Sequence, residues 1–329
     1  MVAFLGLVLL GVPALRNAYW ELVLLTSAIY TIVALSLALL LGRVGMISLG
    51  QVALLAIGGW IALRLGFATS MPFLLVVLAT GLITSVLGTL IGLPALRLSG
   101  LHLALITLMF AAAITLLLEA TQFPNGGSGF LGHSVLTTAP STLRRPGFAS
   151  SDAAYYRLVV VVTALMFLLT IVHIRSRPGR AWAAIRQSEA AALAAGVNVT
   201  LYKLWALALA SFMTGVAGGL LAASGGGLTV YQFPTQNSII LLAVTLMGGI
   251  VSLWGPVVAG LLFEALPALL RMWGLPSDLL TILFGIGVLQ VQLTAAAGLA
   301  SQVPKDLANL VRLASTLIRG RTGHQEHLG

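Results

Sequence analysis

A serine between glycines is the feature of this sequence that comes closest to an enzyme motif. Residues 126–129 read Gly-Gly-Ser-Gly, so Ser128 lies in a Gly-x-Ser-Gly string that could present a nucleophile. A serine needs an adjacent base and a dry site to be activated. Here it follows Pro124-Asn125 in a polar stretch, which is typical of a turn. An intramembrane serine hydrolase using Ser128 is kept as the alternative of an enzyme class.

Nucleotide and metal chemistry have little support in the residue pattern. The lysines, Lys203 and Lys305, follow Tyr202 and Pro304 instead of the glycine of a phosphate-binding loop. We therefore expect no ATP site and no cofactor in this chain, and ATP would be bound by partner subunits. Cysteine is absent and the five histidines are scattered, so no metal site is predicted.

One acidic residue, Glu264, falls near the middle of a predicted membrane span at 254–272. A carboxylate inside a bilayer is costly, which makes it a candidate for function. Arg271 is about 10 Å further along the helix axis, too far for a firm ion pair. A role in helix packing and a role in transport both stay open.

The composition requires these residues to be positioned by membrane helices. The chain has 329 residues, of which 59% are hydrophobic and 8% charged, whereas soluble domains have about 25% charged residues. A span needs about 20 apolar residues. The charge-free runs that are long enough are residues 22–41, 72–96, 98–118 and 279–300. Residues 49–63 and 158–172 are shorter but can be extended by flanking residues, and residues 2–15 add one short run.

Residues 204–263 contain no charged residue and no histidine. We interpret this stretch as two full helices and the start of a third, with breaks at 225–234 and 248–256 that are rich in glycine and proline. The sequence thus predicts an all-α polytopic membrane protein with about 10 transmembrane helices, or as few as about 8 if short ones are re-entrant.

The charges predict the topology. The positive-inside rule assigns the basic loop 175–203 to the cytoplasm, and alternation then places 121–156 outside as a long loop and both termini inside, with 301–329 as a cytoplasmic tail. The net charge of +9 is therefore mostly a topology signal, with a possible contribution from anionic lipid, and nucleic acid is not expected as a partner. We predict one transmembrane domain, 1–329, in the bacterial cytoplasmic (inner) membrane.

The cytoplasmic loop has the pattern of a short helix pair. Pro178 can open the first helix, Ser188 can cap the second, Glu189 favours its first turn, and Gly196 can end it. The second helix is rich in alanine and would gain little by folding alone, so we interpret it as a knob that docks into another protein. A plain interfacial helix on the membrane surface is the alternative.

A sequence echo predicts two pseudo-repeated halves. Residues 45–50 read Gly-Met-Ile-Ser-Leu-Gly and residues 249–255 read Gly-Ile-Val-Ser-Leu-Trp-Gly, each before a predicted helix. Many transporters are built from such internal repeats. Chance recurrence of Gly and Ser in a glycine-rich membrane protein is the alternative.

These blocks carry a resemblance to a known family. The chain resembles the M-type permease subunit of bacterial branched-chain amino acid ABC transporters, the high-affinity, binding-protein-dependent importers. The blocks that match are Gly42-x-x-Gly45-Met46-Ile47-Ser48-Leu49-Gly50-Gln51, Leu93-Pro94-x-Leu96-Arg97-Leu98-x-Gly100, the loop from Gly179 to Lys203, and Gly248-Gly249-x-x-Ser252-x-x-Gly255-Pro256.

The resemblance implies a permease without an ATPase site of its own. Its implied partners are a second, similar permease in a heterodimer, two ATP-binding cassette subunits and an external substrate-binding protein. The residues assigned to ATPase coupling are Arg180, Arg186, Glu189, Ala192 and Gly196. Candidates for the translocation pathway are Ser48, Gln51, His102, Thr107, Ser252 and Glu264. The glycines assigned a structural role are Gly45, Gly50, Gly100, Gly249 and Gly255.

The sequence leaves the solute open. His102, Leu101 and Ala112 replace the tyrosine, aspartate and glutamate that are common in the family, and Ala295-Ala296 replace its Arg-Pro. Branched-chain amino acids are the first expectation, and urea, short amides or other small polar solutes are the alternative.

Overall fold

The computed structural model describes residues 18–95, 100–121, 143–225, 227–274 and 282–286. In these residues the chain is helical and contains no strand, which confirms the all-α prediction. The long helices are α2 (Ala18–Leu39), α3 (Gln51–Ala68), α4 (Phe73–Ala95), α5 (Leu101–Thr121), α6 (Asp152–Arg175), α9 (Val199–Ala222) and α11 (Gly255–Met272). Shorter elements are η2 (Leu40–Val44), η3 (Gly147–Ala149), α7 (Arg177–Gln187), α8 (Glu189–Ala194), η4 (Val230–Gln232) and α10 (Gln236–Gly248).

Seven of the described helices are long and apolar enough to cross a membrane. The prediction of about ten spans is not confirmed. The run 2–15 and the tail 301–329 lie outside the described residues, and so does the run 279–300 except for residues 282–286. The stretch 204–263 also differs from its interpretation, because its second helix, α10, has 13 residues and falls short of a full span. Pro234 precedes this helix and Gly249, at a φ of 105°, ends it.

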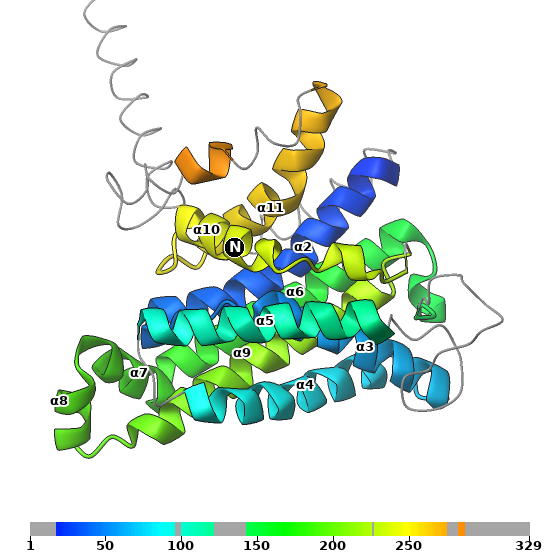
Figure 1. Ribbon diagram of the computed structural model, residues 1–329. Helices are drawn as coiled ribbons and strands as arrows, with labels where there is room; N and C mark the ends of the chain where they lie inside the picture. Colours follow the sequence, from blue (N-terminus) through cyan, green and yellow to red (C-terminus); the bar gives the residue numbers. More distant parts are fainter. Residues whose placement is uncertain (1–17, 96–99, 122–142, 226, 275–281, 287–329) are drawn as a thin grey trace, which may run out of the picture.

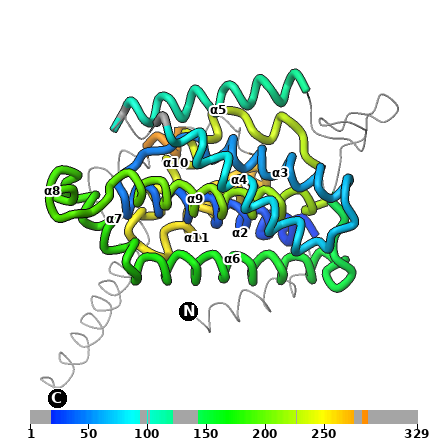
Figure 2. The backbone as a smooth tube through the Cα atoms, turned by 90° about the horizontal axis from the view of Figure 1, so that it is seen from below, coloured from blue at the N-terminus to red at the C-terminus, as the bar shows by residue number. Residues whose placement is uncertain are grey.

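Helix α9 lies at the centre of the bundle, against α2, α3 and α4, while α11 packs along α2. Helices α5 and α6 lie on opposite sides of this core, and α11 is inclined to the rest (Figures 1 and 2). The close contacts use glycine: a Cβ on Gly58 would lie 2.9 Å from the Cα of Gly215. In lipid the hydrophobic effect does not drive helices together. Small residues at the crossings instead let the backbones approach closely and gain van der Waals packing.

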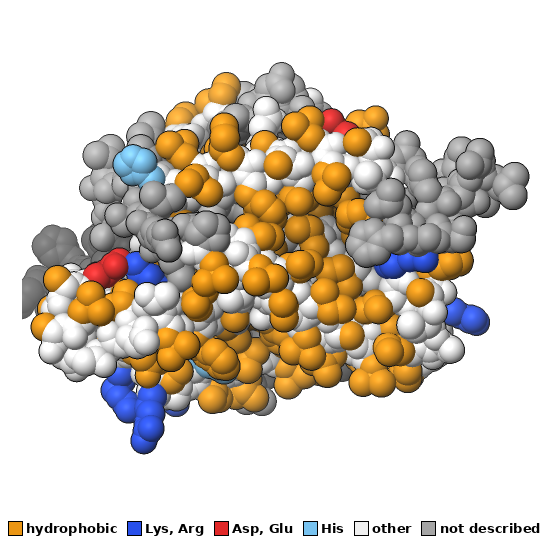
Figure 3. Space-filling model, turned by 60° about the horizontal axis from the view of Figure 1, so that its bottom comes forward, with side chains coloured by type: hydrophobic (Ala, Val, Ile, Leu, Met, Phe, Trp, Pro, Cys, Tyr) orange, Lys and Arg blue, Asp and Glu red, His pale blue; other side chains and the backbone are white. Residues whose placement is uncertain are grey.

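The outer surface is apolar between charged ends. Figure 3 shows hydrophobic side chains across the middle of one face, with Lys and Arg side chains at its two ends. Leu82 and Val86 of α4 and Met109 of α5 are among the large apolar side chains that this surface exposes. Lipid is the natural solvent for such a surface. The chain is therefore a multi-pass membrane protein.

Candidate functional site

The helix pair α7–α8 projects from one end of the bundle (Figure 1). Pro178 lies in the first turn of α7, where its missing N–H costs nothing. The Ser188 hydroxyl accepts a hydrogen bond from the Ala191 N–H and caps α8. Gly196 follows α8 with a φ of 80°. The predicted helix pair and its cap residues are confirmed.

Several contacts fix this pair to the ends of the membrane helices. The Trp182 indole is fully buried and donates to the Tyr202 carbonyl at 2.9 Å, which joins α7 to α9. The Arg186 guanidinium donates to the Gly42 carbonyl in η2, and so joins α7 to the end of α2. Gly179 leaves no room for a Cβ, which would collide with the Ile174 carbonyl of α6. Movement of α7 must therefore move the ends of α2, α6 and α9.

Glu189 has a partner within the chain. Its carboxylate accepts from the Lys203 ammonium at 2.6 Å, and the lysine side chain is only 7% exposed while that of Glu189 is 49% exposed. An uncompensated buried ammonium would be costly, so this pair fastens α8 to the first turns of α9. The sequence had assigned Glu189 to coupling with an ATPase and had suggested no partner within the chain, because Glu189 and Lys203 are on different helices.

The remaining residues assigned to coupling divide by exposure. Arg180 is exposed, whereas Ala192 is 2% exposed and packs within the chain. The adjacent Leu193 is 59% exposed and presents an apolar side chain on the outer surface of α8. A sequence rich in alanine gave no signal as to which side of α8 faces outward.

A second region interrupts the membrane helices. Helix α2 continues into η2 and ends at Gly45, at a φ of 83°, after which the chain is non-helical until α3 begins at Gln51. The Leu49 N–H in this segment donates to the Thr107 hydroxyl of α5 at 2.9 Å. Ser48 is 5% exposed. Non-helical backbone among membrane helices occurs where protein buries it or where it lines a pathway.

A cluster of buried polar groups lies where α3 begins. Gln51 Oε1 accepts from the Thr214 hydroxyl of α9 at 2.7 Å and from Ser36 of α2 at 3.3 Å. Gln51 Nε2 is buried and has no partner among the described residues. The structure thus brings Ser48, Gln51 and Thr107 into one region. Ser36 and Thr214 were missed, since a lone hydroxyl on an apolar helix is too common to be a signal.

The segment 249–254 lies against the end of α2, at the same end of the bundle as α7. The Arg43 guanidinium donates to the Val251 carbonyl at 3.1 Å, and a Cβ on Gly42 would collide with the Ile250 carbonyl. The Ser252 hydroxyl accepts from the Trp254 N–H at 3.2 Å and shapes the turn before α11. Each of the two similar segments, 45–50 and 249–255, therefore precedes a helix. Gly42 and Arg43, just before segment 45–50, contact segment 249–255. A repeat of whole halves stays a prediction.

Three candidates lie apart from these regions. His102 is exposed at the start of α5. Glu264 of α11 accepts from the Thr26 hydroxyl of α2 at 3.4 Å, which fits a contact between these helices. Gly100, at a φ of 58°, has nothing near its missing Cβ. Ser128 lies outside the described residues.

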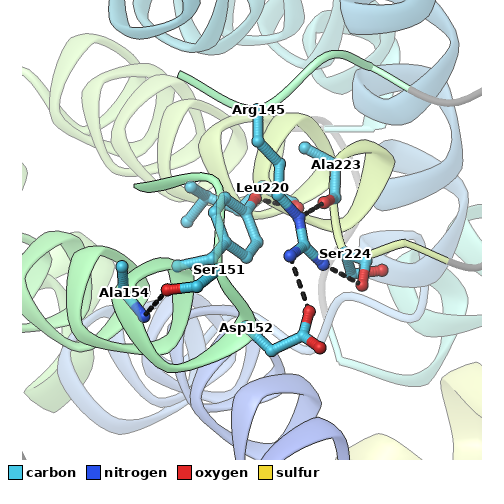
Figure 4. A network of polar contacts seen from close by, with 8 residues as sticks. Arg145, Ser151, Asp152, Ala154, Leu220, Ala223 and Ser224 are labelled. Atoms are coloured by element: carbon cyan, nitrogen blue, oxygen red, sulfur yellow. Dashed lines mark hydrogen bonds and ion pairs between the residues drawn. The ribbon is translucent and has the colours of Figure 1, made fainter. Parts of the chain in front are cut away.

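The opposite end of the bundle is fastened by Arg145 (Figure 4). Its guanidinium donates to the Ala223 and Ser224 carbonyls after α9, both at 2.8 Å, and pairs with Asp152 at 2.6 Å. It also lies over the Tyr155 ring, 4.7 Å from the centroid. The sequence indicated only a basic pair in an external loop.

Comparison with known proteins gives consistent matches. The family model described as "Branched-chain amino acid transport system / permease component" matches residues 19–292. Two curated relatives are "High-affinity branched-chain amino acid transport system permease protein LivM" from Salmonella typhimurium and from Escherichia coli. Each is 30% identical to this chain over an alignment of 269 residues, and the match covers 74% of this chain and 62% of the relative. No solved structure matches significantly.

Proposed function

Since this chain belongs to the family of permease components of branched-chain amino acid transport systems, we propose that it is the transmembrane subunit of an ABC importer. Its substrates are branched-chain or closely related amino acids, as the names of its relatives state for them. Separate ATPase subunits power it, a second permease completes the pore, and an external binding protein delivers the substrate. Its membrane is the bacterial cytoplasmic membrane, an inference that rests on its family.

The observation that carries this proposal is the α7–α8 pair. It projects from the end of the bundle and exposes Arg180 and Leu193. Its inner side is held to the membrane helices by Trp182, Arg186 and the Glu189–Lys203 ion pair. Because the outer side of α7–α8 is exposed and its inner side is bonded to the membrane helices, a displacement of α7–α8 by a partner is transmitted to the bundle. An interfacial helix that merely lies on lipid would not need these contacts.

The mechanism follows from those contacts. Closure of an ATPase dimer on ATP would displace α7–α8, and the bonds from Arg186 to Gly42 and from Trp182 to Tyr202 would carry the displacement to α2 and α9. The bundle then changes between states that open to opposite sides, and each partner biases that equilibrium by binding one state better.

Co-purification tests the central partner. The affinity-tagged chain, extracted in mild detergent from the organism that expresses it, is expected to bring down two ATP-binding cassette subunits. A tagged membrane protein that transports in the opposite direction is purified in the same way, and the ATPase that it captures is the unspecific background. Recovery of the chain without any ATPase, at a salt concentration that preserves other ABC complexes, would contradict the proposal.

Gly196 offers a sharper test of coupling. Its φ of 80° is strained for a β-branched residue by about 1–2 kcal/mol, and nothing lies within 4 Å of its missing Cβ. We expect Gly196→Val to reorient α8 and to lower ATP-driven uptake with unchanged amounts of protein in the membrane. Gly196→Asn, which tolerates this conformation, is the matched control and should retain most uptake. Equal uptake by both variants would contradict a coupling role for this end of α8.

A further inference from the structure

The start of α3 is a buried helix end without acceptors. The first intrahelical bond there runs from the Leu54 N–H to the Gly50 carbonyl. The N–H groups of Gln51, Val52 and Ala53 precede it, and no side chain caps them in the described part of the chain. These three residues are 2%, 1% and 4% exposed. Such groups are normally paired with a side chain, water or a ligand.

Some of the described helices begin with a side-chain cap, whereas α7, α10 and α11, like α3, begin without one. Ser151 caps α6, Ser188 caps α8 and Asn198 caps α9, each through a hydrogen bond from a backbone N–H in the first turn. At α3 the capping position is Gly50, which has no side chain to offer. A Cβ there would lie 3.4 Å from the Phe110 side chain on α5, which is close to ordinary contact.

The Gln51 side chain adds an independent unpaired donor at the same place. The 2.7 Å distance from Gln51 to the Thr214 hydroxyl is typical of an O–H···O bond, which assigns Oε1 to that side of the amide. Nε2 therefore faces away from Thr214 and lacks any acceptor in the described structure. This donor belongs to the first residue of α3, so it lies within one side-chain length of the uncapped N–H groups.

We propose that the start of α3 and the Gln51 amide bind the carboxylate of the transported amino acid. The groups without a partner there are donors, namely the first backbone N–H groups and Gln51 Nε2, and the helix dipole adds a partial positive charge, which favours an anion. Transporters place the start of an interrupted helix against an anionic substrate group in this way. Val52 and Phe110 provide apolar surface beside it for an aliphatic side chain. This inference rests on the proposed function.

In this structure α5 covers the site. Thr107 holds Leu49, and Phe110 lies over Gly50. Helix α5 buries only a narrow row of side chains, including Ala104, Ala111 and Leu118, and its outer side is exposed, with Met109 at 75%. A sideways shift of α5 breaks few contacts and uncovers the donors. On this proposal the substrate reaches the donors when α5 shifts.

The test uses the complete complex, with its permease partner, ATPases and binding protein, in proteoliposomes. ATP-driven uptake of radiolabelled L-leucine is measured beside ATP hydrolysis stimulated by the loaded binding protein. Gln51→Glu keeps the shape but replaces the donor by an acceptor, and Gln51→Met removes the donor. We expect uptake to fall at least about tenfold in Gln51→Glu, the size expected for losing a hydrogen bond to a charged group, and less in Gln51→Met. Stimulated ATP hydrolysis should stay within about twofold of wild type, since α7–α8 is untouched.

Thr80→Val is the matched control, because Thr80 is also fully buried and its hydroxyl has no partner in the described residues. It should leave both activities unchanged. Uptake by the Gln51 variants close to wild type would overturn the site. Parallel loss of uptake and of stimulated hydrolysis would also overturn it, because that pattern belongs to a structural residue. A wild-type complex that hydrolyses ATP but carries no amino acid would instead reject the proposed function, and the carboxylate site with it.

Discussion

A single arginine fastens the end of the bundle opposite α7–α8. Arg145 binds the Ala223 and Ser224 carbonyls, pairs with Asp152 and covers the Tyr155 ring. The last carbonyls of a helix lack intrahelical partners, and a cation there is favoured by the helix dipole. The charged hydrogen bonds thus join the ends of α6 and α9 through the segment that precedes α6.

Arg145→Met should lower the free energy of unfolding of the purified protein by about 2 kcal/mol, because charge-assisted hydrogen bonds of this kind contribute about 1.5–3 kcal/mol. The stability of Arg145→Lys should lie between those of wild type and Arg145→Met, since one ammonium cannot make the several hydrogen bonds of the planar guanidinium. The change is read from thermal unfolding in detergent. The adjacent Arg144, which is exposed, provides the control, and Arg144→Met should stay within about 0.5 kcal/mol of wild type. Equal effects at the two arginines would contradict the fastening role.

What the sequence could predict at this scale depends on how local the interaction is. Pro178, Ser188 and Gly196 act on their own turn, and all were predicted correctly. Arg144 and Arg145 are the same residue type, so the sequence could not tell which of them binds the carbonyls that follow α9. That depends on how this segment lies against α9 in the fold. The same is true of the Glu189–Lys203 pair, whose members lie on different helices.

At the scale of elements, α9 is packed through small residues. A Cβ on Gly218 would lie 2.5 Å from the Leu55 carbonyl oxygen of α3, whereas one on Gly219 would lie 3.4 Å from the Val77 side chain of α4. The first distance requires backbone to move, and the second is close to ordinary contact. Close approach of backbones is the main way in which membrane helices gain packing energy.

These neighbouring glycines give a matched pair of variants. Gly218→Ala should destabilise the protein by about 1–3 kcal/mol, as overpacking does, and should lower the yield of monodisperse protein in size-exclusion chromatography. Gly219→Ala should change little, and a small gain is expected because alanine is the better helix former. If Gly218→Ala changed stability as little as Gly219→Ala, α3 and α9 would not be as close as described.

Helix boundaries show a similar division between local and long-range causes. Runs without charge located the long spans, because lipid excludes charge along the whole length of a helix. They did not reveal that α10 has 13 residues or that α3 begins among buried polar groups. The glycine and proline breaks at 225–234 and 248–256 bound α10 locally, whereas the burial of the start of α3 depends on the neighbouring helices, which composition does not record.

At the scale of the whole molecule, the two ends of the bundle differ in the arginines that bind backbone carbonyls there, and one end carries α7–α8. Arg43 and Arg186 lie at the end that carries α7–α8, and both bind backbone carbonyls that end or interrupt membrane helices. Arg145 fastens the other end. Helix α9 connects the two, from Lys203 near its start to Ala223 just beyond its end. A displacement of α7–α8 therefore has a direct route across the bundle.

The most direct test of the central claim is uptake of radiolabelled L-leucine into proteoliposomes that contain the purified complex of this chain with its partner permease and ATPases. The loaded binding protein is supplied outside and ATP inside. We predict uptake that requires both ATP and the binding protein and that is lost when the ATPase subunits are omitted. Uptake that proceeds equally without ATP, or no uptake of any amino acid by a complex that hydrolyses ATP, would contradict the assignment of this chain as the permease of an amino acid importer.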